Sequence, residues 1–188
     1  YGEITIKCSG PKDISVLDQN IVAIMNSDEL DEIKQAMSPV YWAERNIDVN
    51  QQDPTKRLYV NRWYQSMQIT CSASKKAIRC GRRSGKSYGL GIDIANRLVQ
   101  NSNYQILVVT PFLSQAKELT NVVKKILRSL GDTIGTWDDL VERSVTSPYQ
   151  EIQMKNGSTF KAFTAGNDNA NAVRGQGAHL IIIDEADF

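Results

Sequence analysis

A short, basic, glycine-containing segment carries the first candidate chemistry. It runs CGRRSGKS over residues 80–87. A loop that binds phosphates needs inward-pointing backbone N–H groups, a lysine that reaches the β- and γ-phosphates and a hydroxyl for Mg²⁺. Lys86 and Ser87 supply the last two groups, although Cys80 stands where the strict motif has glycine. A basic turn of no special function is the alternative.

A second candidate is the segment LIIIDE at residues 180–185. An apolar strand that ends in two carboxylates places Asp184 at the carboxyl edge of a sheet, where it can hold the Mg²⁺ shell. Glu185 is then placed to polarise an attacking water. A solvated acidic turn is the alternative for this segment alone. Together, the two motifs favour a Mg²⁺-dependent ATP site.

Charge is strongly segregated in this chain, although the net charge of the 188 residues is only +1. Residues 1–53 carry ten acidic and four basic side chains, whereas residues 56–86 carry nine basic side chains and no acidic one. A stretch with only positive charge favours a polyanion as its partner, either nucleotide phosphates or a nucleic-acid backbone. No run of 18 apolar residues occurs, so we expect no membrane span.

The elements before the loop are predicted to be helical. Ser27 or Asp28 could cap a helix that ends at Met37, and the polar residues 47–56 have the composition of a linker. Residues 58–67 then show apolar side chains at helical spacing. Those side chains are Val60, Trp63, Tyr64 and Met67.

From residue 77 the pattern predicts alternating strands and helices. Strands are expected at 77–80 and 105–110, with a helix over 86–100 and a second helix after Pro111. Such alternation predicts a parallel sheet. The apolar stripe of the second helix comprises Leu113, Ala116, Leu119, Val123, Ile126, Leu127 and Leu130.

Asn156 and Gly157 mark a hairpin between strands at 151–155 and 159–164. A two-residue loop would mix apolar and polar faces, so a three-residue loop over 156–158 is preferred. The pairs that it predicts are Met154 with Phe160 and Ile152 with Ala162. The fully apolar strand at 180–183 is expected to be central in the sheet.

The cysteines and tryptophans carry no predicted chemistry. The three cysteines have no metal-ligand spacing, so we expect reduced thiols, with Cys80 buried beneath the loop. Trp42 and Trp63 are expected to pack rather than to stack on bases.

Taken in order, these motifs resemble the ATPase domain of the large terminase subunit, the DNA-packaging motor of tailed phages. The resemblance runs from about residue 39 to residue 188. The segments that carry it are PVYWA at 39–43, RWYQ at 62–65, the loop with Arg82 four residues before Lys86, VTP at 109–111 with Gln115-Ala116, Val173-Arg174-Gly175 and the acidic strand.

The resemblance implies roles for individual residues. Gln65 would contact adenine, Arg82 would bond the γ-phosphate or the neighbouring turn, and Arg174 would act as an arginine finger on a neighbouring subunit. Their plainer alternatives are a polar helix residue, a solvated loop residue and a local ion pair. The nucleotide would lie on Gly81, Arg82, Arg83, Ser84, Gly85, Lys86 and Ser87, with Mg²⁺ on Ser87 and Asp184, and with Glu185, Lys86, Arg82 and Arg174 as the catalytic set.

The resemblance also implies a fold and partners. The fold would be an additional-strand (ASCE-type) P-loop NTPase, with a mostly parallel sheet flanked by helices and a β-hairpin insertion. Residues 1–55 would form a helical approach segment and residues 56–188 the ATPase core, ending just after the acidic (Walker B) strand. The implied partners are double-stranded DNA, the portal protein, the small terminase subunit and further copies in a ring, in the cytoplasm of the infected bacterial host.

Two other functions remain open at this stage. One is a helicase or other nucleic-acid translocase of the superfamily-2 type, and the other is a non-catalytic nucleotide-binding assembly module. We expect this chain by itself to bind ATP weakly and to hydrolyse it slowly, because later strands of the sheet and the coupling element are absent from the sequence. The nuclease domain of full-length terminases is absent as well.

Overall fold

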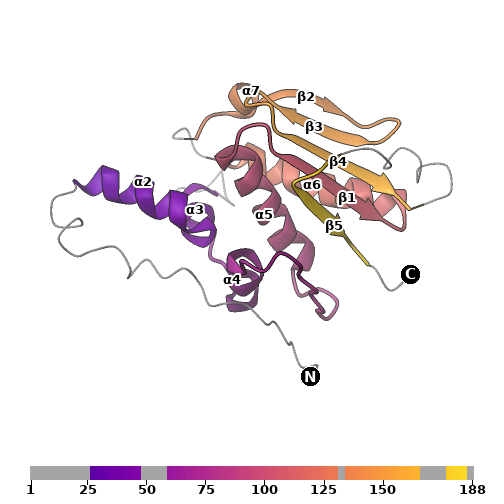
Figure 1. Cartoon of the computed structure of the whole chain (residues 1–188), viewed down its shortest axis with the longest axis horizontal. Helices are drawn as coiled ribbons and strands as arrows, with labels where there is room; N and C mark the ends of the chain where they lie inside the picture. The colour runs from indigo at the N-terminus through magenta and orange to yellow at the C-terminus, as the bar shows by residue number, and fades with distance from the viewer. Residues whose placement is uncertain (1–25, 48–58, 131–133, 166–176, 186–188) are drawn as a thin grey trace. The chain divides into compact units, whose positions relative to one another are not determined.

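The computed structural model describes residues 26–47, 59–130, 134–165 and 177–185. The chain divides into two compact units, Tyr1–Asp93 and Ile94–Phe188, whose boundary falls inside helix α5 (Figure 1). The division at residues 55 and 56 stays a prediction. Arg174 and its neighbours at 173–175 lie outside the described residues.

Two short helices open the described part of the first unit. Helix α2 spans Ser27–Met37 and is capped by Asn26, whose side chain accepts the backbone N–H groups of Asp28 and Glu29. The cap is therefore one residue earlier than the sequence predicted, because Glu29 completes a capping box by accepting the Asn26 N–H. Ser38 ends α2 and caps helix α3, Pro39–Asn46.

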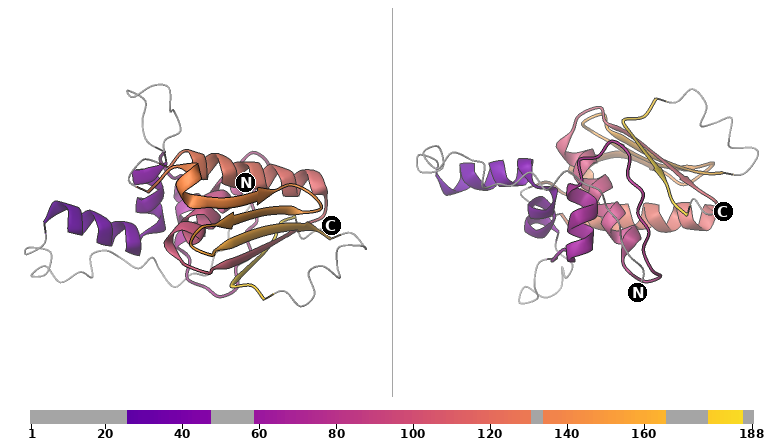
Figure 2. Two further views of the ribbon diagram at one scale, coloured as in Figure 1. Left: turned by 90° about the horizontal axis from the view of Figure 1, so that it is seen from above. Right: turned by 60° about the horizontal axis from the view of Figure 1, so that its bottom comes forward.

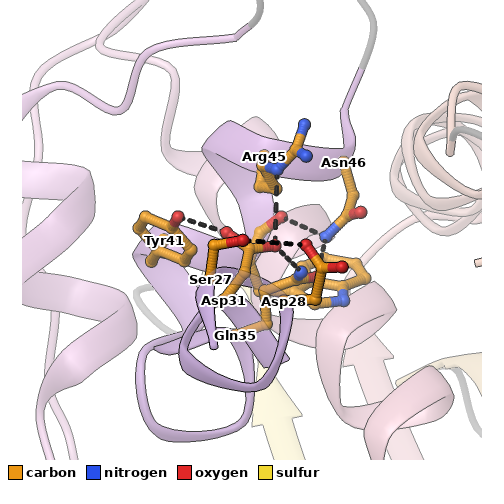
Figure 3. Close-up of polar contacts among 8 residues, drawn as sticks. Ser27, Asp28, Asp31, Gln35, Tyr41, Arg45 and Asn46 are labelled. Atoms are coloured by element: carbon orange, nitrogen blue, oxygen red, sulfur yellow. Dashed lines mark hydrogen bonds and ion pairs between the residues drawn. The ribbon is translucent and has the colours of Figure 1, made fainter. Parts of the chain in front are cut away.

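A polar network joins α2 to α3 (Figure 3). The Asp31 carboxylate accepts hydrogen bonds from the Tyr41 hydroxyl and the Gln35 amide, and Arg45 lies 3.5 Å from it. The hydrogen bond from Tyr41 is the main reason that the pKa of Asp31 lies below its usual value. Trp42 on α3 is fully buried, as predicted.

Helix α4 spans Trp63–Thr70 and does not follow the predicted apolar face. Val60 and Trp63 are exposed to 66% and 67%, so the expectation that Trp63 packs is wrong. The buried side chains of α4 are Gln65, Gln68 and Ile69. The inward face of α4 is therefore mostly polar, and Gln65 on it makes hydrogen bonds to Tyr59, Arg62 and Gly85.

The segment between α4 and α5 also departs from prediction. Within the described range 59–130, residues 77–80 form no strand, because no neighbouring strand pairs with them. Cys71 at the end of α4 is disulfide-bonded, which corrects the expectation of three reduced thiols, and Cys80 is a half-buried free thiol. Helix α5 spans Lys86–Gln100, as predicted.

The second unit is built on a five-stranded mixed sheet in the order β2-β3-β4-β1-β5. Strand β1 (Gln105–Thr110) pairs in parallel with β4 (Thr159–Thr164) and with β5 (Leu180–Ile183). Antiparallel pairs join β2 (Val141–Val145) to β3 (Gln150–Met154) and β3 to β4. Two of the four pairings are thus antiparallel, which corrects the expectation of a mostly parallel sheet. The sequence did not predict β2 or the short helix α7 (Trp137–Leu140).

Helix α6 (Leu113–Arg128) packs along one face of this sheet, against β1, β3 and β4 (Figure 2). The predicted stripe is confirmed from Ala116 to Leu130, whereas Leu113 is 46% exposed. Strand β5 forms an edge of the described sheet instead of a central position, and its Ile181 and Ile183 are largely exposed. An apolar strand sequence does not specify how many neighbours the strand has.

The β3–β4 register differs from both predicted alternatives. Ile152 pairs with Phe160, and the three-residue loop comprises residues 155–157 instead of 156–158. Gly157 takes the left-handed position that such a loop requires, with φ of 83°. The Asn156 side chain donates to the carbonyls of Leu98 and Asn101 at the end of α5. These tertiary hydrogen bonds fix the position of the turn, and the pattern of apolar and polar residues in the two strands contains no sign of them.

No helix in the described part of the chain is long and apolar enough to cross a membrane.

Candidate functional site

The predicted phosphate loop is a tight turn that leads into α5. Arg83 and Gly85 have positive φ values of 59° and 84°, and the Ser84 N–H donates weakly to the Gly81 carbonyl at 3.4 Å. Left-handed residues in a turn are a feature of backbones whose N–H groups converge on an anion. Arg83 is not glycine, so its conformation is uncommon and calls for a local reason.

The first turn of α5 adds donors to this loop. The Gly85 carbonyl accepts the Gly89 N–H at 3.0 Å and so begins the helix. The N–H groups just before Gly89 have no intrahelical acceptor, and the helix dipole favours an anion there. Lys86 and Ser87 lie half-buried in this turn, which has no acidic residue. The turn therefore has the charge and the donors that a phosphate group needs.

Two further observations fit a bound phosphate. Among the described residues, the buried Ser84 hydroxyl has no hydrogen-bond partner. Gly81 is exposed, and a Cβ atom built on it would meet no described atom within 4 Å, so space is open on that side of the loop. The loop thus combines one unpartnered hydroxyl with open space beside Gly81.

Gln65 on α4 forms a hydrogen bond to the backbone of the loop. Its amide nitrogen donates to the Gly85 carbonyl at 3.0 Å. Its amide oxygen accepts the Tyr59 hydroxyl at 2.9 Å and the Arg62 N–H at 3.1 Å. Gln65 is only 3% exposed, and burial raises the pKa of the Tyr59 hydroxyl well above its usual value. The side chain is therefore held at both ends.

The carbonyl of Ser84 receives two more donors from the same segment. The Tyr64 hydroxyl donates to it at 2.5 Å and the Arg62 guanidinium at 3.2 Å. Arg62 also donates to the Tyr64 hydroxyl at 2.8 Å, so the two side chains brace each other. The sequence singled out the RWYQ segment but gave no role to Arg62 or Tyr64. Nothing in the positions of Arg62 and Tyr64 along the sequence distinguishes them from ordinary exposed residues of a helix.

The two predicted carboxylates lie at the end of β5 in the second unit. The Asp184 N–H continues the strand pairing by donating to the Val109 carbonyl, and the Asp184 carboxylate accepts the Glu185 N–H at 3.1 Å. Glu185 has a φ of 54°, unusual for a residue other than glycine. Backbone strain of this kind is concentrated at functional positions.

Gln115 holds the Glu185 carboxylate. It lies in the first turn of α6, and its amide nitrogen donates to Glu185 Oε2. Its amide oxygen is buried and has no partner among the described residues. The sequence named Gln115 within a motif but not as a site residue, because its partner lies 70 residues away.

The described residues contain no cluster of three or more His, Cys, Asp or Glu side chains that could enclose a metal ion. Ser87 belongs to the first unit and Asp184 to the second, and their role as Mg²⁺ ligands stays a prediction.

A comparison with protein families decides the class of the chain. The family described as terminase large subunit, T4likevirus-type, N-terminal, matches residues 78–188. The chain belongs to this family. The terminase match covers the loop and the acidic strand, and it confirms the resemblance drawn from the sequence. The motifs at 39–43 and 62–65 lie before it, and no curated protein matches the chain.

Proposed function

We propose that this chain is the ATPase motor part of a viral large terminase, which hydrolyses ATP to drive double-stranded DNA into a procapsid. The observation that carries the proposal is the terminase match over a segment holding both a phosphate-type loop at a helix start and a strand ending in Asp184 and Glu185. The additional-strand P-loop NTPase fold is part of this proposal. The described five-stranded sheet and its helices are compatible with it.

The loop residues bind and orient the triphosphate. Backbone N–H groups from Gly81 to Ser87 receive phosphate oxygens, and Lys86 reaches the β- and γ-phosphates. Arg82 and Arg83 add positive charge, and family resemblance assigns adenine to Gln65 and an arginine finger to Arg174. Ser87 and Asp184 would hold Mg²⁺, which would neutralise charge on the phosphate oxygens.

Glu185 acts on the attacking water. Its carboxylate accepts a proton from water as the oxygen approaches the γ-phosphorus in line with the leaving group. Gln115 holds one carboxylate oxygen through its amide, and we assign the water to the other oxygen. Lys86 and the arginines stabilise charge on the transferred phosphoryl group.

The family also provides the proposed partners. These are double-stranded DNA, the portal protein, the small terminase subunit and further copies of the chain in a ring, in the host cytoplasm. The basic stretch at 56–86 supports contact with a polyanion.

The test is binding of a fluorescent ATP analogue with Mg²⁺ to the native chain and to Lys86→Ala. We expect the variant to lose binding by at least about tenfold, because the ammonium group contacts phosphate oxygens directly. Lys75→Ala is the matched control, since Lys75 is an exposed lysine of the same basic stretch outside the loop. Equal binding by all three proteins, with folding verified by circular dichroism, would contradict the proposal.

A further inference from the structure

Two successive carbonyl groups of the loop are held from outside by one segment of the chain. We propose that Arg62, Tyr64 and Gln65 form a carbonyl clasp on Ser84 and Gly85 that sets the direction of the loop's phosphate-binding N–H groups. The three side chains are positioning residues for nucleotide binding, and the inference rests on the proposed function. The clasp goes beyond the adenine contact that family resemblance assigns to Gln65.

The geometry of the peptide bond links the clasp to the ligand. In a trans peptide the C=O of one residue and the N–H of the next point in opposite directions within one plane. The Ser84 carbonyl points at the Tyr64 hydroxyl and the Arg62 guanidinium. The Gly85 N–H must therefore point away from these two donors.

Without the clasp this peptide plane would be free to turn over. Gly85 adopts positive and negative φ with similar ease, so its own backbone does not select one orientation. In the flipped orientation the Ser84 carbonyl oxygen would face the phosphate and repel it. The flip is costly because the Ser84 carbonyl would lose its hydrogen bonds from Arg62 and Tyr64 together. The hydrogen bond between Arg62 and Tyr64 holds the two donors in place.

Gln65 secures the next peptide in the same way. The Gly85 carbonyl accepts both the Gln65 amide and the Gly89 N–H, so the first hydrogen bond of α5 is tied to α4. The fit is close, because a Cβ atom on Gly85 would lie 3.0 Å from the Gln65 amide nitrogen. The Lys86 N–H belongs to the same peptide plane and is thereby directed beyond the N-terminus of α5.

The clasp predicts an effect that does not depend on the base. A residue that contacts adenine contributes to binding ATP but nothing to binding inorganic tripolyphosphate. A residue that orients the loop N–H groups contributes equally to both ligands. Tripolyphosphate with Mg²⁺ is therefore the probe that separates the two roles.

The experiment measures the dissociation constants of Mg²⁺-tripolyphosphate and of a non-hydrolysable ATP analogue by calorimetry. We expect Tyr64→Phe to weaken both ligands by about three- to tenfold, and Gln65→Ala to weaken both by about tenfold. The matched control is Tyr41→Phe, which removes a hydroxyl bonded to Asp31 in the α2–α3 network (Figure 3) and leaves both constants unchanged.

The outcomes separate the clasp from the proposed function. Unchanged binding of both ligands by folded Tyr64→Phe overturns the clasp alone, and so does a Gln65→Ala variant that loses only the ATP analogue. A native chain that binds neither ligand overturns the proposed function and the clasp with it. If Tyr64→Phe does not fold, the native chain still decides: tripolyphosphate must shift the amide resonance of Gly85, and an unmoved resonance refutes the clasp.

Discussion

Helices α4 and α6 have comparable apolar content at helical spacing, but α6 buries mostly apolar side chains, whereas two of the three side chains that α4 buries are glutamines. Helix α6 turns Leu119, Val123 and Leu127 fully inward against the sheet. Helix α4 leaves Trp63 and Met67 exposed and buries Gln65 and Gln68. Helix α6 is placed mainly by apolar burial, whereas α4 combines the burial of Ile69 with hydrogen bonds from Gln65 to the loop that follows it.

This difference separates a helix that stabilises the fold from a helix that shapes a site. Apolar burial is non-directional and contributes to stability wherever complementary surfaces meet. Hydrogen bonds to specific carbonyl groups add little net stability but fix an orientation. Damage to α6 should therefore appear mainly as lost stability, and damage around α4 mainly as altered loop geometry.

The largest effect should come from Leu127→Ala in α6. Leu127 is fully buried, so the variant leaves a cavity and lowers the free energy of unfolding by about 2–5 kcal/mol. Urea unfolding measures this loss. Leu113→Ala is the matched control, because Leu113 is 46% exposed and its removal should cost less than about 1 kcal/mol. Equal losses in the two variants would show that α6 is not placed by its buried stripe.

A smaller effect, on binding instead of folding, is expected from Gly85→Ala. Alanine at a φ of 84° costs about 1–2 kcal/mol, and its Cβ would press on the Gln65 amide. Tripolyphosphate binding should weaken by about tenfold, as measured by calorimetry. Gly177→Ala is the control, since Gly177 lies outside the loop and a Cβ there would come no nearer than 3.9 Å to a described atom, so binding should change by less than about twofold. Indistinguishable variants would argue against close contact between α4 and the loop.

The smallest effect is expected from Gln68→Met. The Gln68 amide nitrogen is buried and has no partner among the described residues, so an apolar side chain of similar length removes an unsatisfied group. The free energy of unfolding should stay the same or rise by up to about 1 kcal/mol. Thermal unfolding is the measurement, with Gln100→Met at an exposed position as the reference. A loss above about 2 kcal/mol would show that this buried glutamine is a structural anchor.

The sequence correctly predicted the helices and strands whose apolar residues, spaced as in that element, are also the residues buried in the fold. Helix α5, strand β1 and the buried stripe of α6 follow from spacing and caps, and the segment holding both candidate motifs falls within the family match. The roles given to Lys86, Ser87, Asp184 and Glu185 stay predictions. The hairpin was placed correctly, but its register was not, because Asn156 bonds to α5 residues that no local pattern connects to it.

What the sequence could not predict depends on partners far along the chain. The inward face of α4 is chosen by the carbonyls of Ser84 and Gly85, about twenty residues later. The position of β5 depends on which strands surround it, and its apolar composition is the same for an edge strand as for a central one. The positive φ of Glu185 likewise could not be predicted, because glutamate as a residue type does not favour that conformation.

The β3–β4 loop at 155–157, together with Ser158 after it, carries a consequence for the order of events during synthesis. The carbonyl of Leu98 near the end of α5 is satisfied by Asn156, 58 residues later, and that of Asn101 by both Asn156 and Ser158. A chain leaving the ribosome therefore makes α5 long before it makes the groups that complete its C-terminal end. Until the hairpin is made, water must satisfy these carbonyl groups, so the C-terminal end of α5 reaches its final hydrogen bonding only after β3 and β4 have formed.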